Sequence, residues 1–272
     1  LHIPERHLGQ GDGMLKYEEI PCGAIKKYYK TFLKRDPKRF RKHIQNYQKN
    51  KIYNLENILP YKIIEKYIVP GNNEIGGKEN GDIEEEWSEY FITFPYRNEW
   101  DNVVFIMDVS GSMYTTGNNK NIDKIPINVG LSLGLLTQDK IYNLSEHPEQ
   151  VELKKETLLK YIQKAVHMNY SNDVNLDKMI SNLKVKKNQK LFIVTDQNLS
   201  VNTYPFDITI WNVSDPFIKV KKIKDVLYLN GFSKCVYNHV LQNPFFDPSE
   251  IVDNIVNDVK YKKILEKIKN KQ

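Results

Sequence analysis

The stretch Val103–Met113 constrains the fold of this chain more than any other part of its sequence. It opens with the apolar run Val-Val-Phe-Ile-Met, which is typical of a strand buried within a sheet. Asp108, Ser110 and Ser112 follow at every second position, and in an extended exit loop this spacing turns the three side chains the same way. Gly111 allows a tight bend between the serines. Small oxygen donors at the end of a buried strand suit a hard divalent cation, Mg²⁺ or Mn²⁺.

A second apolar run, Lys190–Asp196, also ends at a carboxylate. Further strands are expected over 141–144, 150–153, 206–213 and 226–231, and helices over 125–136, 158–168, 176–183, 235–241 and 249–268. Strands that alternate with helices favour an α/β fold with a doubly wound, mostly parallel sheet. Ligands bind such sheets beyond the carboxyl ends of the strands. Asp108 and Asp196 are both expected at such ends, so they are expected to share one site.

The first third of the chain has a helical pattern instead. Apolar and aromatic residues recur at helical spacing from Ile20 to about Asn50, and Pro37 divides this stretch into two helices. Another helix is expected over 60–67, a Gly- and Asn-rich linker over 70–82, and a helix from the acidic run at 84–86. We therefore expect a small α-helical region over 1–96 and an α/β domain over 97–272.

The net charge of +6 is unevenly distributed. Residues 26–51 contain eleven Lys or Arg and a single acid, Asp36. Tyr28, Tyr29, Phe32, Phe40 and Tyr47 lie among these charges, so one hypothesis is that the helices bind RNA through phosphate contacts and base stacking. The alternative is that the aromatic side chains form a core and the charges a solvated face. The candidate RNA contacts are Lys26, Lys27, Lys30, Lys34, Arg35, Lys38, Arg39, Arg41 and Lys42.

Several classes of protein fit the sequence poorly. No run of 18 apolar residues occurs and residues 1–6 do not resemble a secretory signal, so we expect an intracellular, cytoplasmic protein, virion-associated if viral. A haloacid-dehalogenase-type phosphotransferase needs a second Asp where Ser110 stands. A serine hydrolase needs a Gly before its nucleophile and a partner His, and neither His147 nor His167 has a visible relation to the serines. We therefore expect no enzymatic activity.

The sequence Asp-x-Ser-x-Ser after a hydrophobic strand resembles the metal-ion-dependent adhesion site of von Willebrand factor A (VWA) domains. The resemblance implies that the hydroxyls bind the metal directly, that the aspartates act partly through water, and that a partner protein's carboxylate completes the site. It also implies a second loop with a threonine ligand. That loop corresponds to Asn169–Asn175, where Asn172 occupies the threonine position and Ser171 precedes it. The implied metal-binding residues are Asp108, Ser110, Ser112, Ser171, Asn172 and Asp196, with Mg²⁺ or Mn²⁺ as the cofactor.

Four other segments extend the resemblance: Lys27–Phe40, Ile58–Ile64, Trp211–Val213 and Asn230–Lys234. With them the chain is similar to a Ro-like (TROVE-related) family found in plants, fungi and large DNA viruses. Members of this family join a helical region, related to the Ro RNA-binding autoantigen, to a carboxyl-terminal VWA domain. The resemblance therefore implies a VWA domain after a Ro-like helical region, with a protein partner and structured RNA as expected ligands.

Overall fold

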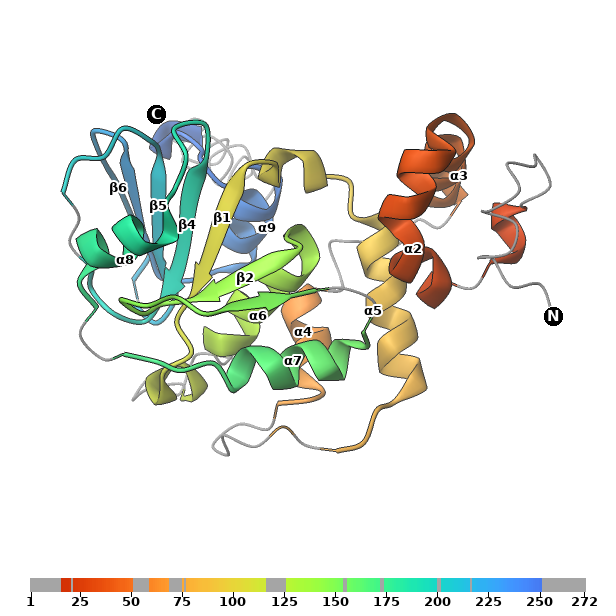
Figure 1. Ribbon diagram of the computed structural model, residues 1–272, viewed down its shortest axis with the longest axis horizontal. Helices are drawn as coiled ribbons and strands as arrows, with labels where there is room; N and C mark the ends of the chain where they lie inside the picture. The colour runs from red at the N-terminus through yellow and green to blue at the C-terminus, as the bar shows by residue number, and fades with distance from the viewer. Residues whose placement is uncertain are drawn as a thin grey trace, which may run out of the picture.

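The computed structural model describes residues 16–20, 22–50, 59–68, 75, 77–115, 126–153, 156–171, 174–199, 202–215 and 217–250. Within these residues one twisted sheet carries helices on both faces (Figure 1). Two further helices, α2 (Cys22–Arg35) and α3 (Pro37–Asn50), lie at one end of the molecule and follow the short 3₁₀ turn η1 (Tyr17–Glu19). The two helices expected on either side of Pro37 are thereby confirmed.

The described strands are β1 (Val103–Met107), β2 (Lys140–Asn143), β3 (Gln150–Glu152), β4 (Lys190–Thr195), β5 (Ile208–Asn212), β6 (Lys219–Ile223) and β7 (Val226–Asn230). They are arranged in the order β3-β2-β1-β4-β5-β7-β6. The two edge strands, β3 and β6, pair antiparallel, and the other pairs are parallel. The strand order reverses between β1 and β4, so a ligand is expected at their carboxyl ends. The predicted α/β, doubly wound, mostly parallel fold is confirmed.

The strand β6 has no counterpart in the sequence prediction. It pairs with β7 from Lys219 to Ile223, although only Val220 among its residues is even partly buried. An edge strand pairs through its backbone on one side, so it needs no apolar face. Its lysines also discourage a further strand from adding to the free edge. The absence of hydrophobic alternation explains why the sequence pattern does not reveal this strand.

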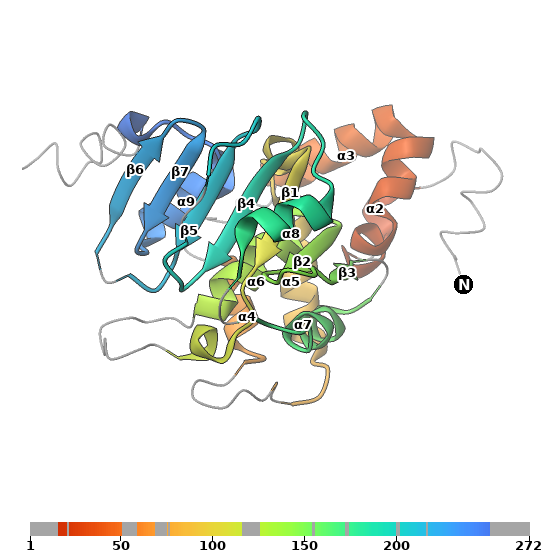
Figure 2. The same ribbon diagram turned by 60° about the vertical axis from the view of Figure 1, so that its left-hand side comes forward.

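The two faces of the sheet bury different side chains because strand residues alternate in direction. Phe105 and Met107 contribute to the larger core, whereas Ile106 lies in the smaller one. The larger core is closed by α4 (Pro60–Glu65), α5 (Gly81–Thr93), α6 (Pro126–Thr137), α7 (Leu158–Val166) and α9 (Lys234–Gln242), and the smaller by α8 (Leu176–Leu183). Figure 2 shows α8 in front of the sheet and α9 behind it.

The helix α6 is buried along its whole length, as its apolar sequence predicts. Gly130 and Gly134 lie one turn apart and face the sheet. A Cβ atom at Gly130 would lie 2.9 Å from the Met107 sulfur, and one at Gly134 would lie 2.8 Å from Ile141 Cγ2. These contacts are shorter than van der Waals distance, so the two glycines permit the close approach of helix and sheet.

The helices before the sheet divide between two cores. Phe32 and Phe40, both 0% exposed, form a small core between α2 and α3 that Ile92 of α5 also enters. Trp87, five residues earlier on α5, lies in the larger core together with α4. The helix α5 therefore faces both cores, and the expected domain boundary between residues 96 and 97 stays a prediction.

Among the described residues, none of the helices has the length and hydropathy that a membrane-spanning segment needs. The helix expected over 249–268 begins at Pro248, and its remainder lies outside the described residues.

Candidate metal centre

The ends of β1 and β4 bring Asp108 and Asp196 together from distant parts of the sequence. Met107 pairs with Val194 in the parallel register, and the Asp108 N–H continues the ladder by donating to the Val194 carbonyl oxygen at 2.8 Å. Asp196 follows two residues after Val194. Both carboxylates therefore stand at the carboxyl edge of the sheet, where the strand order reverses. We refer to this edge, with Asp108, Ser110, Ser112 and Asp196, as the β1–β4 rim.

Asp108 is held in place by three hydrogen-bond donors. Its Oδ1 accepts from the Ser110 N–H at 2.9 Å, and its Oδ2 accepts from the Thr195 hydroxyl at 2.8 Å and from Gln197 Nε2 at 3.1 Å. The side chain is 1% exposed. A buried carboxylate with donors to both oxygens is held in one orientation.

Ser110 and Ser112 converge through a turn rather than through an extended loop. Ser110 has an extended backbone, but the chain then enters the 3₁₀ turn η3 (Gly111–Tyr114). The expectation of an extended exit loop through Ser112 is therefore wrong. The turn still brings the two hydroxyl oxygens within 3.0 Å of each other. Ser110 is 3% exposed, whereas Ser112 lies at the surface. The rim thus presents one buried and one accessible hydroxyl.

Asp196 is the less satisfied of the two carboxylates. Its Oδ1 atom is buried and has no hydrogen-bond partner among the described residues. Burial raises the pKa of this carboxyl above its ordinary value, a hydrogen bond from Ser112 lowers the pKa, and the neighbouring Asp108 raises it. An oxygen-rich site with two nearby carboxylates and an unpaired buried oxygen fits a hard divalent cation. No group of three or more His, Cys, Asp or Glu side chains among the described residues offers an alternative metal site.

The second expected loop is described at its two ends only. Ser171 is half-buried, Asn172 lies outside the described residues, and whether either binds a metal stays a prediction. At the start of the loop, the buried Asn143 side chain at the end of β2 donates to the Asn169 carbonyl oxygen. Glu149 accepts from the Asn169 N–H at 3.2 Å. Because β2 lies beside β1, these contacts place the beginning of the loop at the same edge of the sheet as Asp108.

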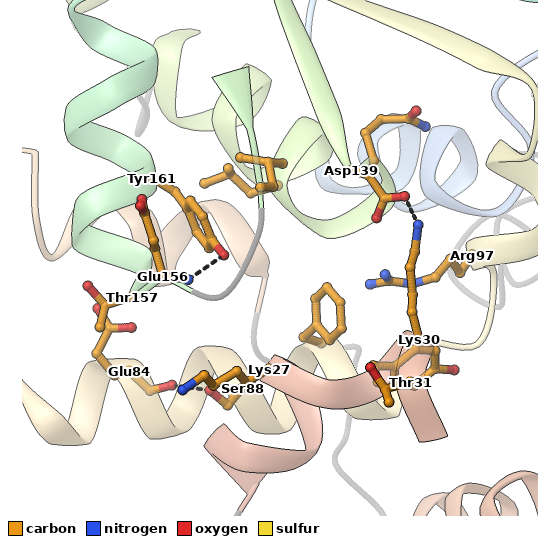
Figure 3. Close-up of a pocket in the computed structure, with 15 residues that line it drawn as sticks. Lys27, Lys30, Thr31, Glu84, Ser88, Arg97, Asp139, Glu156, Thr157 and Tyr161 are labelled. Atoms are coloured by element: carbon orange, nitrogen blue, oxygen red, sulfur yellow. Dashed lines mark hydrogen bonds and ion pairs between the residues drawn. The ribbon is translucent and has the colours of Figure 1, made fainter. Parts of the chain in front are cut away.

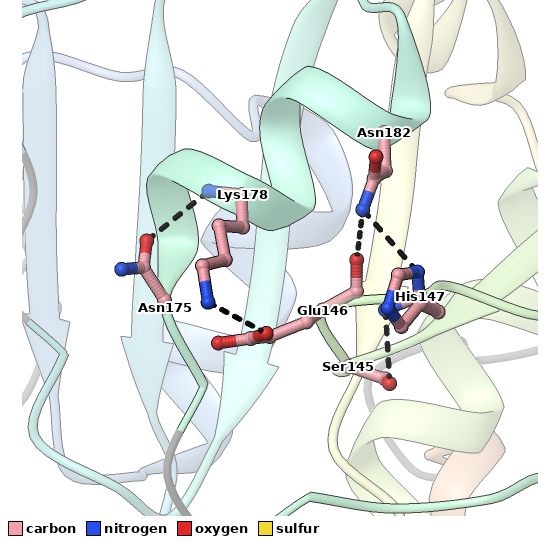
Figure 4. Close-up of polar contacts among 6 residues, drawn as sticks. All are labelled: Ser145, Glu146, His147, Asn175, Lys178 and Asn182. Atoms are coloured by element: carbon pink, nitrogen blue, oxygen red, sulfur yellow. Dashed lines mark hydrogen bonds and ion pairs between the residues drawn. The ribbon is translucent and has the colours of Figure 1, made fainter.

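At the other end of this loop, Asn175 caps α8 by accepting from the Lys178 N–H at 3.1 Å (Figure 4). The Lys178 ammonium lies 3.3 Å from Glu146, in the loop that follows β2. Asn182 donates to the Glu146 carbonyl oxygen at 2.6 Å and also contacts His147. The polar side chains in Figure 4 therefore fasten α8 to the loop after β2.

Thr195, Gln197 and Asn212 are residues of the rim that the sequence interpretation missed. Thr195 and Gln197 orient Asp108. Asn212, at the end of β5, donates to the Asp196 carbonyl oxygen at 3.3 Å and to Asn198 Oδ1 at 3.2 Å, which holds the loop after β4. The available signal was a set of polar residues at the carboxyl ends of otherwise apolar strands.

The candidate RNA contacts lie on the surface of α2 and α3. The Lys26 side chain lies outside the description. The eight other candidate side chains are exposed, namely Lys27, Lys30, Lys34, Arg35, Lys38, Arg39, Arg41 and Lys42.

The described aromatic side chains between these cations pack against other side chains and are buried or half-buried. Phe32 and Phe40 are fully buried, and the half-buried Tyr29 meets Phe40 and Phe91 edge-on. The Tyr47 side chain lies outside the description. The described aromatic side chains therefore favour the core interpretation over a base-stacking platform.

No family model and no curated protein matches the chain. A solved structure similar to it, the crystal structure of the Deinococcus radiodurans RO (RSR) protein, shares 13% sequence identity and superposes with a TM-score of 0.49. The alignment covers 89% of this chain and 55% of that one, so this chain spans about half the length of the Deinococcus protein. Site residues cannot be transferred between chains at this level of identity.

Proposed function

We propose that the β1–β4 rim holds Mg²⁺ or Mn²⁺ and recognises a carboxylate of a partner protein, as in the adhesion sites of VWA domains. The buried, unpartnered Oδ1 atom of Asp196 beside Asp108 carries this proposal. Two carboxylates in one partly buried site repel each other unless a cation lies between them. The rim has two hydroxyls within reach of the same space, which are neutral ligands for that cation.

The residues of the rim would have different roles in such a site. Ser110 and Ser112 supply direct ligands, Asp196 supplies charge, and Asp108 is kept in its orientation by Thr195 and Gln197. When bound, the cation offers a Lewis-acidic position to an incoming carboxylate oxygen. Recognition of this kind makes and breaks no covalent bond, so the proposed protein is a binding protein rather than an enzyme. Asn172 or Ser171 is the proposed ligand from the second loop.

Calorimetric titration with MnCl₂ tests the metal site. The wild-type chain is expected to bind one Mn²⁺, and the Asp196→Asn and Ser112→Ala variants are expected to lose most of this affinity. Thr195→Val acts through Asp108 and should weaken binding by about 10- to 100-fold. At a metal concentration of about 100 times Kd, the melting temperature should rise by about 5–10 °C.

Asp225→Asn and Ser181→Ala are the matched controls. Asp225 lies in the turn before β7, at the opposite edge of the sheet, and Ser181 is exposed on α8. Both variants should bind Mn²⁺ as the wild type does. Equal Mn²⁺ binding by Asp196→Asn and Asp225→Asn would exclude the rim as the metal site.

Selection from a displayed peptide library tests the partner class. Peptides retained in MnCl₂ and released by EDTA should contain Asp or Glu, and replacing that residue by Asn or Gln should abolish binding. Retention of peptides without an acidic residue, or retention that persists in EDTA, would argue against carboxylate recognition at the metal.

A second candidate function is polyanion binding, with structured RNA as the proposed ligand. The eight exposed cations on α2 and α3 favour it. Since Phe32 and Phe40 are buried, the contacts would be to phosphates and carry little sequence preference. For about four phosphate contacts, affinity for structured RNA should fall about 50- to 150-fold between 50 and 200 mM salt.

Charge reversal separates this function from the metal-dependent one. The triple variant Lys34→Glu, Lys38→Glu, Arg41→Glu should lose RNA binding and keep Mn²⁺ binding. The control triple variant Lys160→Glu, Lys186→Glu, Lys187→Glu changes the net charge equally at exposed positions elsewhere. If both triple variants lose RNA binding equally, the α2–α3 surface is not the binding site.

A further inference from the structure

A cavity of about 510 Å³ lies between α2, α5 and α7, beside the connection from α6 to β2 (Figure 3). Asp139 on its wall directly precedes β2. Because β1 and β2 are parallel, the cavity lies at the amino edge of the sheet, opposite the β1–β4 rim. Its volume falls in the range that small-molecule sites occupy. Apolar and aromatic walls are contributed by Tyr29, Phe91, Leu135, Leu153 and Tyr161.

Arg97 provides the cavity with a cation that lies within ion-pair distance of no described carboxylate, although Asp101 acts on it at longer range. It belongs to the 3₁₀ turn η2 (Arg97–Trp100), and its guanidinium carbon lies 3.7 Å from the Phe91 ring centroid and 5.5 Å from that of Tyr29. One nitrogen donates to the Leu136 carbonyl oxygen at 2.6 Å. Enclosure of the guanidinium lowers the pKa of Arg97 to about 10, so the group stays charged at neutral pH. A planar cation against an aromatic ring at a cavity wall favours an anionic ligand.

The two lysines that line the cavity are less suited than Arg97 to bind an anion inside it. Lys30 forms an ion pair with Asp139 across the cavity wall. Lys27 is exposed, with its ammonium 5.2 Å from the Tyr28 ring centroid. Arg97 is therefore the group best placed to receive an anion inside the cavity.

The opposite wall carries two hydrogen-bond acceptors with no donor. Figure 3 shows Glu156 and Thr157 across the cavity from Arg97 and Lys30. Among the described residues, Glu156 Oε2 and Thr157 Oγ1 are buried and have no hydrogen-bond partner. Glu156 Oε1 is occupied by Lys164 at 2.7 Å, so only the second carboxylate oxygen is unused. Buried acceptors of this kind are costly unless something donates to them.

The Thr157 hydroxyl makes no capping hydrogen bond because the Glu84 carboxylate caps α7 instead. It occupies the N-cap position of α7, where a hydroxyl usually accepts from the first turn. Here Glu84 of α5 accepts from the Leu158 and Leu159 N–H groups at 2.6 and 3.0 Å. Because Glu84 caps α7 in its place, the Thr157 hydroxyl is left without a hydrogen-bond partner among the described residues, on a residue that lines the cavity.

We propose that this cavity binds a small organic anion with a flat, apolar body and a hydrogen-bond donor at its far end. The anionic group contacts Arg97, the body packs between the aromatic walls, and the donor is accepted by Thr157 Oγ1 and Glu156 Oε2. The site needs no metal and lies apart from the β1–β4 rim, so it stands independently of the proposed adhesion function.

Three matched probes test the proposal by calorimetry and ligand-observed NMR, all in EDTA so that the β1–β4 rim does not contribute. Indole-3-propionate has the anion, the flat body and an N–H donor. Indole-3-propanol lacks the anion, and naphthalene-propionate lacks the donor. Indole-3-propionate should bind best, the alcohol about 10- to 100-fold more weakly, and the naphthalene compound about 3- to 10-fold more weakly.

Variants locate the binding. Thr157→Val preserves shape and removes only the unpartnered hydroxyl, so it should fold normally and bind indole-3-propionate about 3- to 10-fold more weakly, while its affinity for the naphthalene compound stays unchanged. Thr203→Val is the control, because the Thr203 hydroxyl accepts from Lys224 in the β6–β7 turn and does not line the cavity. Arg97→Gln should lose about 10- to 100-fold and no longer distinguish the acid from the alcohol.

These measurements distinguish specific binding in the cavity from an empty cavity and from non-specific hydrophobic binding. If Arg97→Gln fails to fold, the Thr157→Val and probe comparisons still decide. No binding of indole-3-propionate at millimolar concentration would overturn the proposal in favour of a water-filled cavity. Equal binding of the three probes, or equal loss in Thr157→Val and Thr203→Val, would overturn it as non-specific hydrophobic binding. Metal binding at the β1–β4 rim should be unchanged in Thr157→Val whichever result is obtained.

Discussion

The two edges of the sheet contrast in how they are built and in the charged groups they enclose. The β1–β4 rim comes from two strand ends and places two carboxylates beside two hydroxyls. The cavity at the other edge takes residues from α2, α5, η2 and α7, and encloses the guanidinium of Arg97. Counting only the described residues, buried oxygens without a hydrogen-bond partner occur at both, at Asp196 in the rim and at Glu156 and Thr157 in the cavity. The contrast teaches that opposite edges of one sheet can gather different charged groups, paired carboxylates at the rim and an enclosed guanidinium in the cavity.

Within the rim, the two carboxylates should respond oppositely to removal, and the largest effect is expected at Asp108. Asp108→Ala leaves the Thr195 hydroxyl, the Gln197 amide and the Ser110 N–H without their acceptor. The free energy of unfolding should fall by about 3–5 kcal/mol, as measured by urea denaturation in EDTA. A loss under about 1 kcal/mol would mean that water replaces the carboxylate and that Asp108 is not rigidly held.

The next largest effect compares the two glycines of α6, which face different parts of the sheet. A methyl group at Gly134 would meet the branched Ile141 and the Phe105 ring, which cannot easily move. At Gly130 it would meet the flexible end of Met107. Gly134→Ala should therefore destabilise by about 2–3 kcal/mol and Gly130→Ala by less than about 1.5 kcal/mol, judged by thermal unfolding. The reverse order would show that the helix tilts away from β2 more easily than Met107 repacks.

The smallest effect is a pH dependence at Asp196. Because burial and Asp108 raise the pKa of Asp196 in the folded chain, ionising it costs stability. In EDTA, stability should fall as pH rises from the ordinary value of 3.8 through the raised pKa, and Asp196→Asn should lack this component. The variant should therefore be the more stable protein at pH 7 in EDTA and the less stable one in saturating Mg²⁺. Asp225→Asn should show neither change. Parallel pH profiles for wild type and Asp196→Asn would contradict the assigned cause.

The elements that sequence reasoning located were those with strong periodicity. The bounds of β1 follow its apolar run, and α6 is as buried as its composition predicts. The short Lys219–Ile223 strand could not be found this way, because an exposed edge strand is held by backbone hydrogen bonds alone. The candidate rim was recognisable because Asp108, Ser110 and Ser112 are close in sequence. Their supporting residues were missed because Thr195 and Gln197 contact Asp108 from the end of β4 and the loop after it, not from its own segment.

The sequence by itself determined the alternation of strands and helices, the burial of the central strands and the acidic strand ends, because these follow from local hydrophobic patterns. Only the tertiary structure decided which carboxylate keeps an unpaired oxygen, which aromatic side chains are buried, and that Glu84 displaces Thr157 from its capping role. The physical reason is that hydrogen-bond satisfaction and burial depend on neighbours brought by folding, and no local pattern specifies those neighbours.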